Sequence, residues 1–427
     1  MASTHGIRIP AFLAERLTGH THSRLVDTTL ASFSDWIGRN DTIFFRDYTD
    51  HGIKHLEDIL ETSSNLITKA AADRFTGEDA ATLICSVVLH DCALHLQEQS
   101  FIALITDAKD WRNASEFEDE RWSVLWSRYI SEASRLNQTQ LIELFGVQAP
   151  VDPPKIHEPD SWTPSQHLLI GEFLRRHHAR IAHEIALSGI PGANGRSPLD
   201  DMRPDDPLHA FVRLSGLVAR SHGLHLRSMF DPLEANYHLR VYRNCHPIYI
   251  MVLLRVADYL QLQSNRAPGG LLRVKRLRTP RSRREWQAHE AISDILYDQN
   301  EDPEVVEVRV EPKRTAISTF LTLQQWLRDA QAELDSSWAV LGEVYGRYPE
   351  KDLGITIRRI RSNIENTSEF GKRAGFVPDR IQFTAANAEL LKLLIKPLYG
   401  DYPEISVREL VQNAGGRLQG AALCRQT

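Results

Sequence analysis

Residues 78–99 read EDAATLICSVVLHDCALHLQEQ and decide the fold of the first part of the chain. Apolar residues recur at helical spacing, so that Ile84, Val87 and Asp91 share one face of a predicted helix. His90 adjoins that face, and a histidine and a carboxylate therefore interrupt a core-facing stripe. Because burying an ionised aspartate without a partner is costly, two interpretations stand. The dipeptide is either a hydrogen-bonded core histidine with a capping aspartate, or a pair of metal ligands.

Later helical stretches repeat this pattern, and they read TPSQHLLIGEFLRRHHARIAHEIA (163–186), LHAFVRLSGLVARSHG (208–223) and IYIMVLLRVADYLQL (248–262). His178 lies within the first apolar stripe, with His177 at its edge, whereas His222 and Asp258 continue the other two stripes. A single inward histidine is more often a core residue with its hydrogen bonds satisfied. Several on consecutive helices indicate a shared centre, and imidazole with carboxylate suits divalent Mn, Fe, Co, Ni or Zn.

The order H…HD…H…H…D resembles the HD superfamily of phosphohydrolases and phosphodiesterases over about residues 40–265. Its first motif matches RDYTDHGIKHLEDIL (46–60), where His55 is followed by an aliphatic Ile59, although His51 competes in the form DHGxxH. The resemblance implies that one metal ion is held by His55, His90, Asp91 and Asp258.

His178 and His222 resemble the additional histidines that hold a second metal ion or contact the substrate phosphate in some HD branches. The resemblance therefore implies a metal-dependent phosphohydrolase or phosphodiesterase with Asp91, His178 and His222 as catalytic residues. A nucleotide or nucleic-acid phosphoester is the expected substrate, with one or two transition-metal ions, or Mg²⁺, as cofactor. We expect the joints at 97–165 and 190–207 to set specificity. The alternative is a non-catalytic nucleotide sensor that regulates an attached ATPase.

The fold is predicted to be mainly α, with an all-helical HD bundle over residues 1–268 and a small α+β extension over 269–375. In the extension we predict strands and helices for these segments: LLRVKRL (271–277), VVEVRVEP (305–312) and GITIRRIRS (354–362) as strands, EWQAHEAISDILYDQ (285–299) and TFLTLQQWLRDAQAELDSSWAVLGEVYGRY (319–348) as helices.

The segment 376–427 contains LLKLLIKPLYGDYPEISVRELVQNA (390–414), which resembles the opening of a GHKL (Bergerat-fold) ATPase. In that class the helix ExxxN supplies a water-polarising glutamate and a magnesium-binding asparagine, which here are Glu409 and Asn413. The chain ends without the downstream DxGxG segment of the class. We therefore expect an incomplete, inactive nucleotide site in a truncated or frame-shifted version of a longer protein.

The composition of the 427 residues, with a net charge of −6, gives no support to sequence-independent binding of nucleic acid. One basic patch is the exception and is either a solvated strand and turn or a phosphate-contacting surface: Arg273, Lys275, Arg276, Arg278, Arg281, Arg283 and Arg284. No apolar run approaches the ~20 residues of a membrane span, and no secretion signal is evident, so we expect a cytoplasmic protein. The four cysteines form no CxxC pair, which argues against a zinc ribbon or disulfide framework. Homo-oligomerisation is left open.

Overall fold

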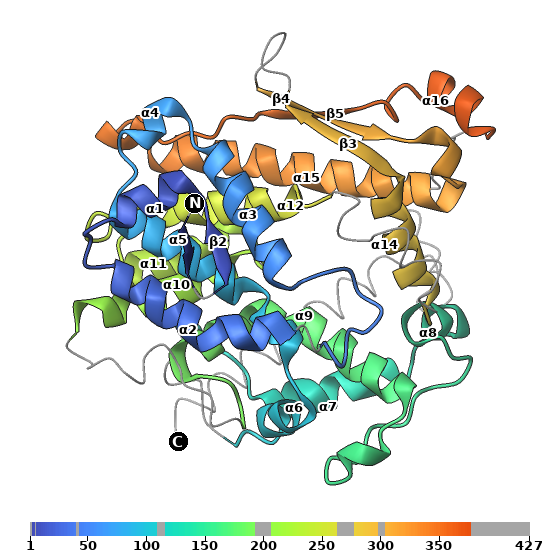
Figure 1. The fold of residues 1–427 in the computed structure, drawn as a ribbon. Helices are drawn as coiled ribbons and strands as arrows, with labels where there is room; N and C mark the ends of the chain where they lie inside the picture. The colour runs from blue at the N-terminus through green and yellow to red at the C-terminus, as the bar shows by residue number, and fades with distance from the viewer. Residues whose placement is uncertain are drawn as a thin grey trace, which may run out of the picture. The chain divides into compact units, whose positions relative to one another are not determined.

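The computed structural model describes residues 2–4, 6–39, 42–108, 116–192, 206–262, 277–297 and 304–376 (Figure 1). Residues Met1–Pro378 form one compact unit and Asp379–Thr427 a second. The second unit, with Glu409 and Asn413, lies outside the described residues, so the predicted ATPase segment is untested by the structure.

The described part of residues 1–268 is mainly helical, as predicted. Its helices are α1 (Ala11–Leu17), α2 (Ser23–Arg39), α3 (Ile53–Leu66), α4 (Lys69–Ala72), α5 (Gly77–His90), α6 (Glu98–Ile105), α7 (Trp122–Ala133), α8 (Gln138–Phe145), α9 (Pro164–Ser188), α10 (Pro207–Ser221), α11 (Phe230–Asn236) and α12 (Pro247–Tyr259). The prediction of an all-helical segment was wrong at its start, where β1 (Ala2–Thr4) and β2 (Ile7–Ile9) form an antiparallel hairpin. Ile7 and Ile9 are buried on either side of an exposed Arg8, which is the alternation of a strand.

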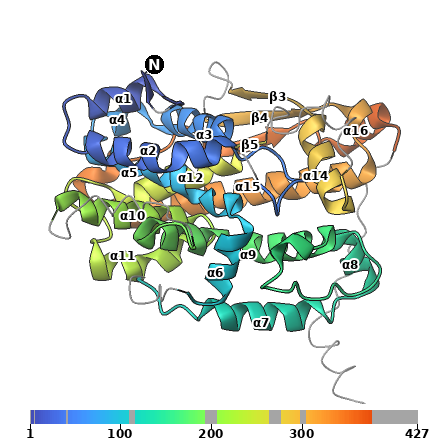
Figure 2. The ribbon, with the colours of Figure 1, turned by 60° about the horizontal axis from the view of Figure 1, so that its bottom comes forward.

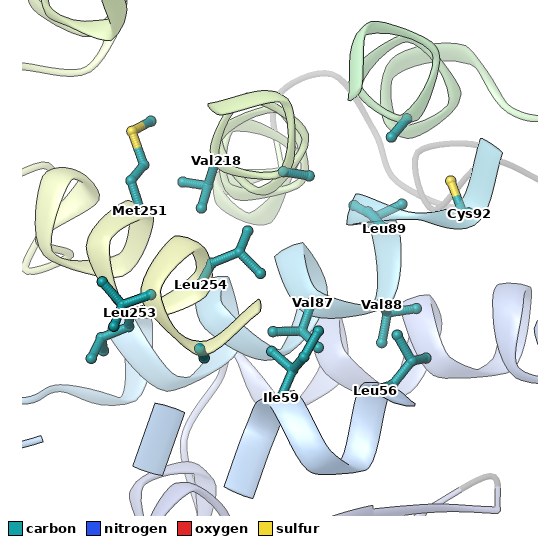
Figure 3. Packing of buried hydrophobic residues seen from close by; sticks show 14 of the residues in the cluster. Leu56, Ile59, Val87, Val88, Leu89, Cys92, Val218, Met251, Leu253 and Leu254 are labelled. Atoms are coloured by element: carbon teal, nitrogen blue, oxygen red, sulfur yellow. The ribbon is translucent and has the colours of Figure 1, made fainter. Parts of the chain in front are cut away.

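Helix α5 is the centre of the bundle. Thr76 and Asp79 form a capping box at its start, and nearly every side chain along it is buried. The helix packs against α1, α2, α3, α9, α10 and α12. Figure 3 shows how apolar side chains from α3, α5, α10 and α12 meet in this core, among them Ile59, Val87 and Leu254.

The helix that carries the HD dipeptide is shorter than the sequence pattern predicts. It ends at His90, and Asp91 is its C-cap residue, with φ −108° and ψ 6°. A 3₁₀ turn, Cys92–His95, follows before α6 begins. Asp91 therefore leaves the helix where the chain turns, and its carboxylate is presented to several helices at once. Among the described helices, none alone is long and apolar enough to cross a membrane. Gly77–His95 and Glu98–Ile105 together have the length and composition of a span, but the chain bends by 93° between them.

The extension consists of α14 (Pro280–Ala291), β3 (Ile292–Tyr297), β4 (Val305–Val310), α15 (Ile317–Val344), β5 (Arg359–Ser362) and α16 (Thr367–Ala374). The sheet has the order β3-β4-β5, with β3 antiparallel and β5 parallel to β4. Helix α15 contacts α12 of the bundle, α14 and β5, and it lies along the sheet in Figures 1 and 2. One cluster of buried apolar side chains runs through bundle and extension. The predicted boundary at residue 268 falls outside the described residues and stays a prediction.

The sequence predictions for the extension were partly right. Strands β4 and β5 and helix α15 are confirmed, but residues 285–299 are not one helix, because α14 ends at Ala291 and β3 follows. Pairing with β4 outweighs the local helical pattern there. The predicted strand at 271–277 lies, apart from Leu277, outside the described residues.

A buried ion pair fixes the extension to the bundle. Arg255 of α12 donates to both carboxylate oxygens of Glu333 on α15, at 2.6 and 2.7 Å. The same guanidinium donates to the carbonyl oxygens of Ser221, the last residue of α10, and Leu224. Arg255 therefore ties α15 to the two chain segments that carry Asp258 and His222.

Candidate metal centre

The carboxylate of Asp91 lies at the middle of a cluster of histidines. Its Oδ2 atom is 3.0 Å from Nδ1 of His51, 3.2 Å from Nε2 of His90 and 3.6 Å from Nε2 of His55. His55 on α3 and His90 on α5 also place their Nε2 atoms 3.7 and 4.0 Å from Oδ1 of Asp258 on α12. The segments that supply these side chains are thus far apart in the sequence and converge at one point.

The other carboxylate oxygen of Asp91 faces a second pair of histidines. Its Oδ1 atom lies 3.6 Å from Nε2 of His178 on α9 and 3.9 Å from Nε2 of His222, the C-cap residue of α10. The two Nε2 atoms are 2.7 Å apart. Asp91 therefore stands between two groups of potential ligands, one facing each oxygen.

The tautomers of three histidines follow from their backbone contacts. Nδ1 of His90 lies 2.7 Å from the carbonyl oxygen of Val87, and Nδ1 of His178 lies 2.7 Å from that of Arg175. His222 makes the same contact with the carbonyl oxygen three residues before it. Because a carbonyl only accepts, each Nδ1 carries a proton, and Nε2 presents a lone pair to the centre whenever the ring is neutral, as His90 becomes when a cation replaces its Nε2 proton.

This arrangement fits a bound cation. The buried Nε2 of His90 has no hydrogen-bond partner among the described residues and faces two carboxylate oxygens. Two lone pairs, on Nε2 of His178 and of His222, meet at 2.7 Å with no proton to share in the neutral rings. A divalent ion accepts electron pairs from such nitrogens and compensates the carboxylates, and the donor set of imidazole and carboxylate is that of a transition-metal site.

The surroundings of the cluster shift the pKa values of its members in different directions. Burial acts to raise the pKa of Asp91, but the charge of His90 and hydrogen bonds from His51 and His55 outweigh it and hold that pKa well below its usual range. Burial acts to lower the pKa of His90, whereas Asp91 and Asp258 raise it to about 9. Burial, with the neighbouring His178 and His90, lowers the pKa of His222 to about 3. Near neutral pH the cluster thus contains ionised Asp91 and a neutral His222.

Comparison with known protein families matches residues 45–336 to the HD-CE family. The chain belongs to the HD-CE family. The match includes every residue of the cluster, all of α12 and most of α15, which confirms that the domain is of the HD type. The HD-CE match ends before the segment that resembles a GHKL ATPase and gives that resemblance no support. No curated protein and no solved structure shows significant similarity to the chain.

A cavity of about 380 Å³ opens beside the cluster. The bundle and the residues that follow α12 line most of it: Tyr48, His51, Asp91, Leu94, Arg175, His178, His222, Asp258, Tyr259, Gln261 and Leu262. The extension completes the wall with His289 of α14 and with Trp326 and Asp329 of α15. Among the described residues, none from 97–165 or 190–207 lines this cavity. The expectation that those joints set specificity stays a prediction.

The structure brings together the six residues proposed as ligands, namely His55, His90, Asp91, Asp258, His178 and His222. It adds His51, which the motif left as a competitor of His55, since both lie near Asp91. His177 instead packs against Trp122 and Phe173. Sequence reasoning missed the extension residues, because periodicity along one helix does not show which distant helix it faces.

The basic patch has only part of its residues in the described structure. Arg281 and Arg284 lie on α14 rather than on a strand or turn. Arg281 pairs with Glu285 at 3.1 Å, and Arg284 donates to both carboxylate oxygens of Glu143 at 3.0 and 2.6 Å. The segment 273–276 lies outside the described residues. A contact between this patch and nucleic acid stays a prediction.

Proposed function

We propose that this chain is a metal-dependent phosphohydrolase or phosphodiesterase that acts on a nucleotide or nucleic-acid phosphoester. One observation carries the proposal: the Asp91 carboxylate stands between two groups of imidazole and carboxylate ligands on the wall of a cavity. Membership of the HD-CE family agrees with it.

The residues divide into two ligand groups that share Asp91. His55, His90 and Asp258 would hold one ion with Asp91 Oδ2, while His178 and His222 would hold a second with Asp91 Oδ1. When bound, divalent ions of this kind polarise phosphoryl oxygens and lower the pKa of coordinated water. In their neutral tautomers His178 and His222 accept but do not donate at Nε2, which favours a ligand role over a direct contact with phosphate oxygens.

His51 is suited to moving a proton. Its Nδ1 lies 3.0 Å from Oδ2 of Asp91, and the ring lines the cavity. When Nδ1 donates to the carboxylate, the proton-accepting position of the ring is Nε2. His51 thus serves as general base for the attacking water or as general acid for the leaving oxygen.

Arg175 provides positive charge in the same cavity. Its Nε and Nη2 atoms donate to Glu172 at 2.9 and 2.8 Å, which fixes the guanidinium plane. Because Arg175 lines the cavity, its charge attracts an anionic phosphate toward the ligand groups.

The cavity contains aromatic side chains that support the nucleotide class. Tyr48, Tyr259 and Trp326 line it, and aromatic faces of this kind stack on nucleobases. Asp329, one turn after Trp326 on α15, offers a hydrogen-bond acceptor in the same cavity. A phosphoester with a planar base would therefore contact bundle and extension together.

The test is a screen of the purified chain against nucleoside mono-, di- and triphosphates and short oligonucleotides, with Mn²⁺, Co²⁺, Ni²⁺, Zn²⁺ or Mg²⁺. We expect metal-dependent release of phosphate or cleavage of a diester that is lost in Asp258→Ala and retained in His177→Ala. Nucleotide binding without turnover under every metal would favour the sensor. Turnover that survives in Asp258→Ala would contradict the proposed site.

A further inference from the structure

We propose that His20, His22 and Glu78 form a separate site for a divalent transition-metal ion, of the zinc class, that fastens the link between α1 and α2 to the start of α5. His20 and His22 lie in the link, in the sequence HTH, and Glu78 lies in the first turn of α5. One ligand atom from each lies within 4.8 Å of those from the others.

The spacing of His20 and Glu78 is that of two ligands around an ion. Nε2 of His20 is 3.4 Å from Oε2 of Glu78. A nitrogen–oxygen hydrogen bond is most often about 2.9–3.0 Å long. Two ligands at about 2.0–2.1 Å from a tetrahedral ion are separated by about 3.3–3.4 Å. The amide of Asn244 lies 3.4 Å from the other oxygen, Oε1, and so leaves Oε2 to face His20.

His22 supplies an observation that hydrogen bonding does not explain. The residue is only 8% exposed, and its buried Nε2 atom has no hydrogen-bond partner among the described residues. Its backbone N–H lies 3.3 Å from Nδ1 of His20, so a chain of long hydrogen bonds from His22 through His20 to Glu78 is the competing interpretation. That chain leaves Nε2 of His22 unsatisfied, and a metal ion at this cluster gives it an acceptor for its lone pair.

Gly77 creates the space in which the ring of His20 lies. A Cβ atom at this position would be 2.6 Å from Cδ2 of His20 and 2.9 Å from the carbonyl oxygen of Arg16. The imidazole therefore packs directly on the first residue of α5, beside Glu78. A larger residue at position 77 would therefore displace the ring of His20, although His20, His22 and Glu78 would all still be present in the sequence.

The site is distinct from the centre at Asp91. Gly77 and His90 are the first and last residues of α5, and a rise of 1.5 Å per residue separates them by about 20 Å. An ion at the first end would join residues 20–22 to α5 and stabilise the folded state, since it binds that state in preference to the unfolded chain. Its removal would leave the phosphohydrolase ligands in place.

The experiment measures bound zinc per chain and the zinc-dependent rise in melting temperature for three proteins. These are the parent, the double variant His22→Ala/Glu78→Gln, and His157→Ala as a control on an exposed histidine. We expect the double variant to bind one ion fewer than the parent and to lose part of the zinc-dependent rise, while the metal-dependent turnover per folded molecule is retained. Equal metal content and an equal rise in parent and double variant would overturn the proposal.

A second variant covers the case in which the double variant does not fold. Gly77→Ala keeps every ligand, and alanine is otherwise favoured over glycine within a helix. We expect it to lose the same ion as the double variant. Full metal content in Gly77→Ala would contradict the placement of His20 in the site.

Discussion

Removal of the Glu333 carboxylate tests whether the extension supports the candidate centre. The side chains of Arg255 and Glu333 are 5% and 9% exposed and share two short hydrogen bonds. Glu333→Ala leaves a buried guanidinium without its counter-ion, and breaking a buried pair in this way typically costs about 3–5 kcal/mol. The carbonyl oxygens of Ser221 and Leu224 still accept from Arg255, so we expect the lower end, about 3 kcal/mol.

Urea unfolding at neutral pH gives the free energies of the parent, Glu333→Ala and the double variant Arg255→Met/Glu333→Leu. Replacing both partners with apolar residues removes the unpaired charge, so the double variant should recover most of the loss. Because Arg255 lies one turn before Asp258 and binds the carbonyl oxygen next to His222, Glu333→Ala should also bind metal more weakly. A loss below about 0.5 kcal/mol, or a double variant no more stable than Glu333→Ala, would refute this reasoning.

Three further predictions concern the ligands, the cavity and the response to pH. His178→Ala or His222→Ala should lower turnover about a hundredfold to a thousandfold, as expected for removal of a group that stabilises transition-state charge, with the ion at His55, His90 and Asp258 still bound. His177→Ala should retain activity, and lowered stability with full turnover in the first two variants would reject the catalytic role. Trp326→Ala should raise KM for a nucleotide about tenfold, at the scale of one lost stacking contact, with kcat little changed; an unchanged KM would place the base elsewhere. Burial acts to raise the pKa of Glu116, but the hydrogen bond and charge of His183, with a nearby arginine, lower it to about 2 from an ordinary 4.5. The stabilisation that the ionised Glu116 gives to the folded state is present above pH 4.5 and is lost as the pH falls toward 2. Between pH 6 and 3.5 the free energy of unfolding of the parent should therefore fall by about 1.4 kcal/mol more than that of Glu116→Gln. Equal losses in the two proteins would contradict this prediction.

Five of the six proposed ligands could be found from the sequence because they lie on or beside an apolar stripe, whereas His55 was proposed from the resemblance to the HD motif. His178 and Asp258 lie on long helices whose periodicity shows an inward face, and the HD-type order of motifs joined them to His90 and Asp91. The shared position of Asp91 was not predictable in this way, since it depends on the helix ending at His90. Local periodicity does not show where a buried helix stops.

Other parts of the site depend on contacts between segments far apart in the chain. His289 and Trp326 reach the cavity because α15 packs on α12 and α14, and the sequence of either helix gives no sign of that partner. His20 and His22 lie in the link before α2, and although His22 precedes Leu25 and Val26 at helical spacing, this alone does not indicate a metal site. Their relation to Glu78 appears only when the α1–α2 link lies against α5.

The most direct test of the central claim is the transition-metal content of the purified parent and of Asp91→Ala, measured by elemental analysis with turnover on the same preparations. Asp91 faces both ligand groups, so its removal should affect every ion held there. The account predicts that Asp91→Ala contains at least one ion per chain fewer than the parent and has no metal-dependent hydrolysis. Equal metal content in the two folded proteins would contradict it.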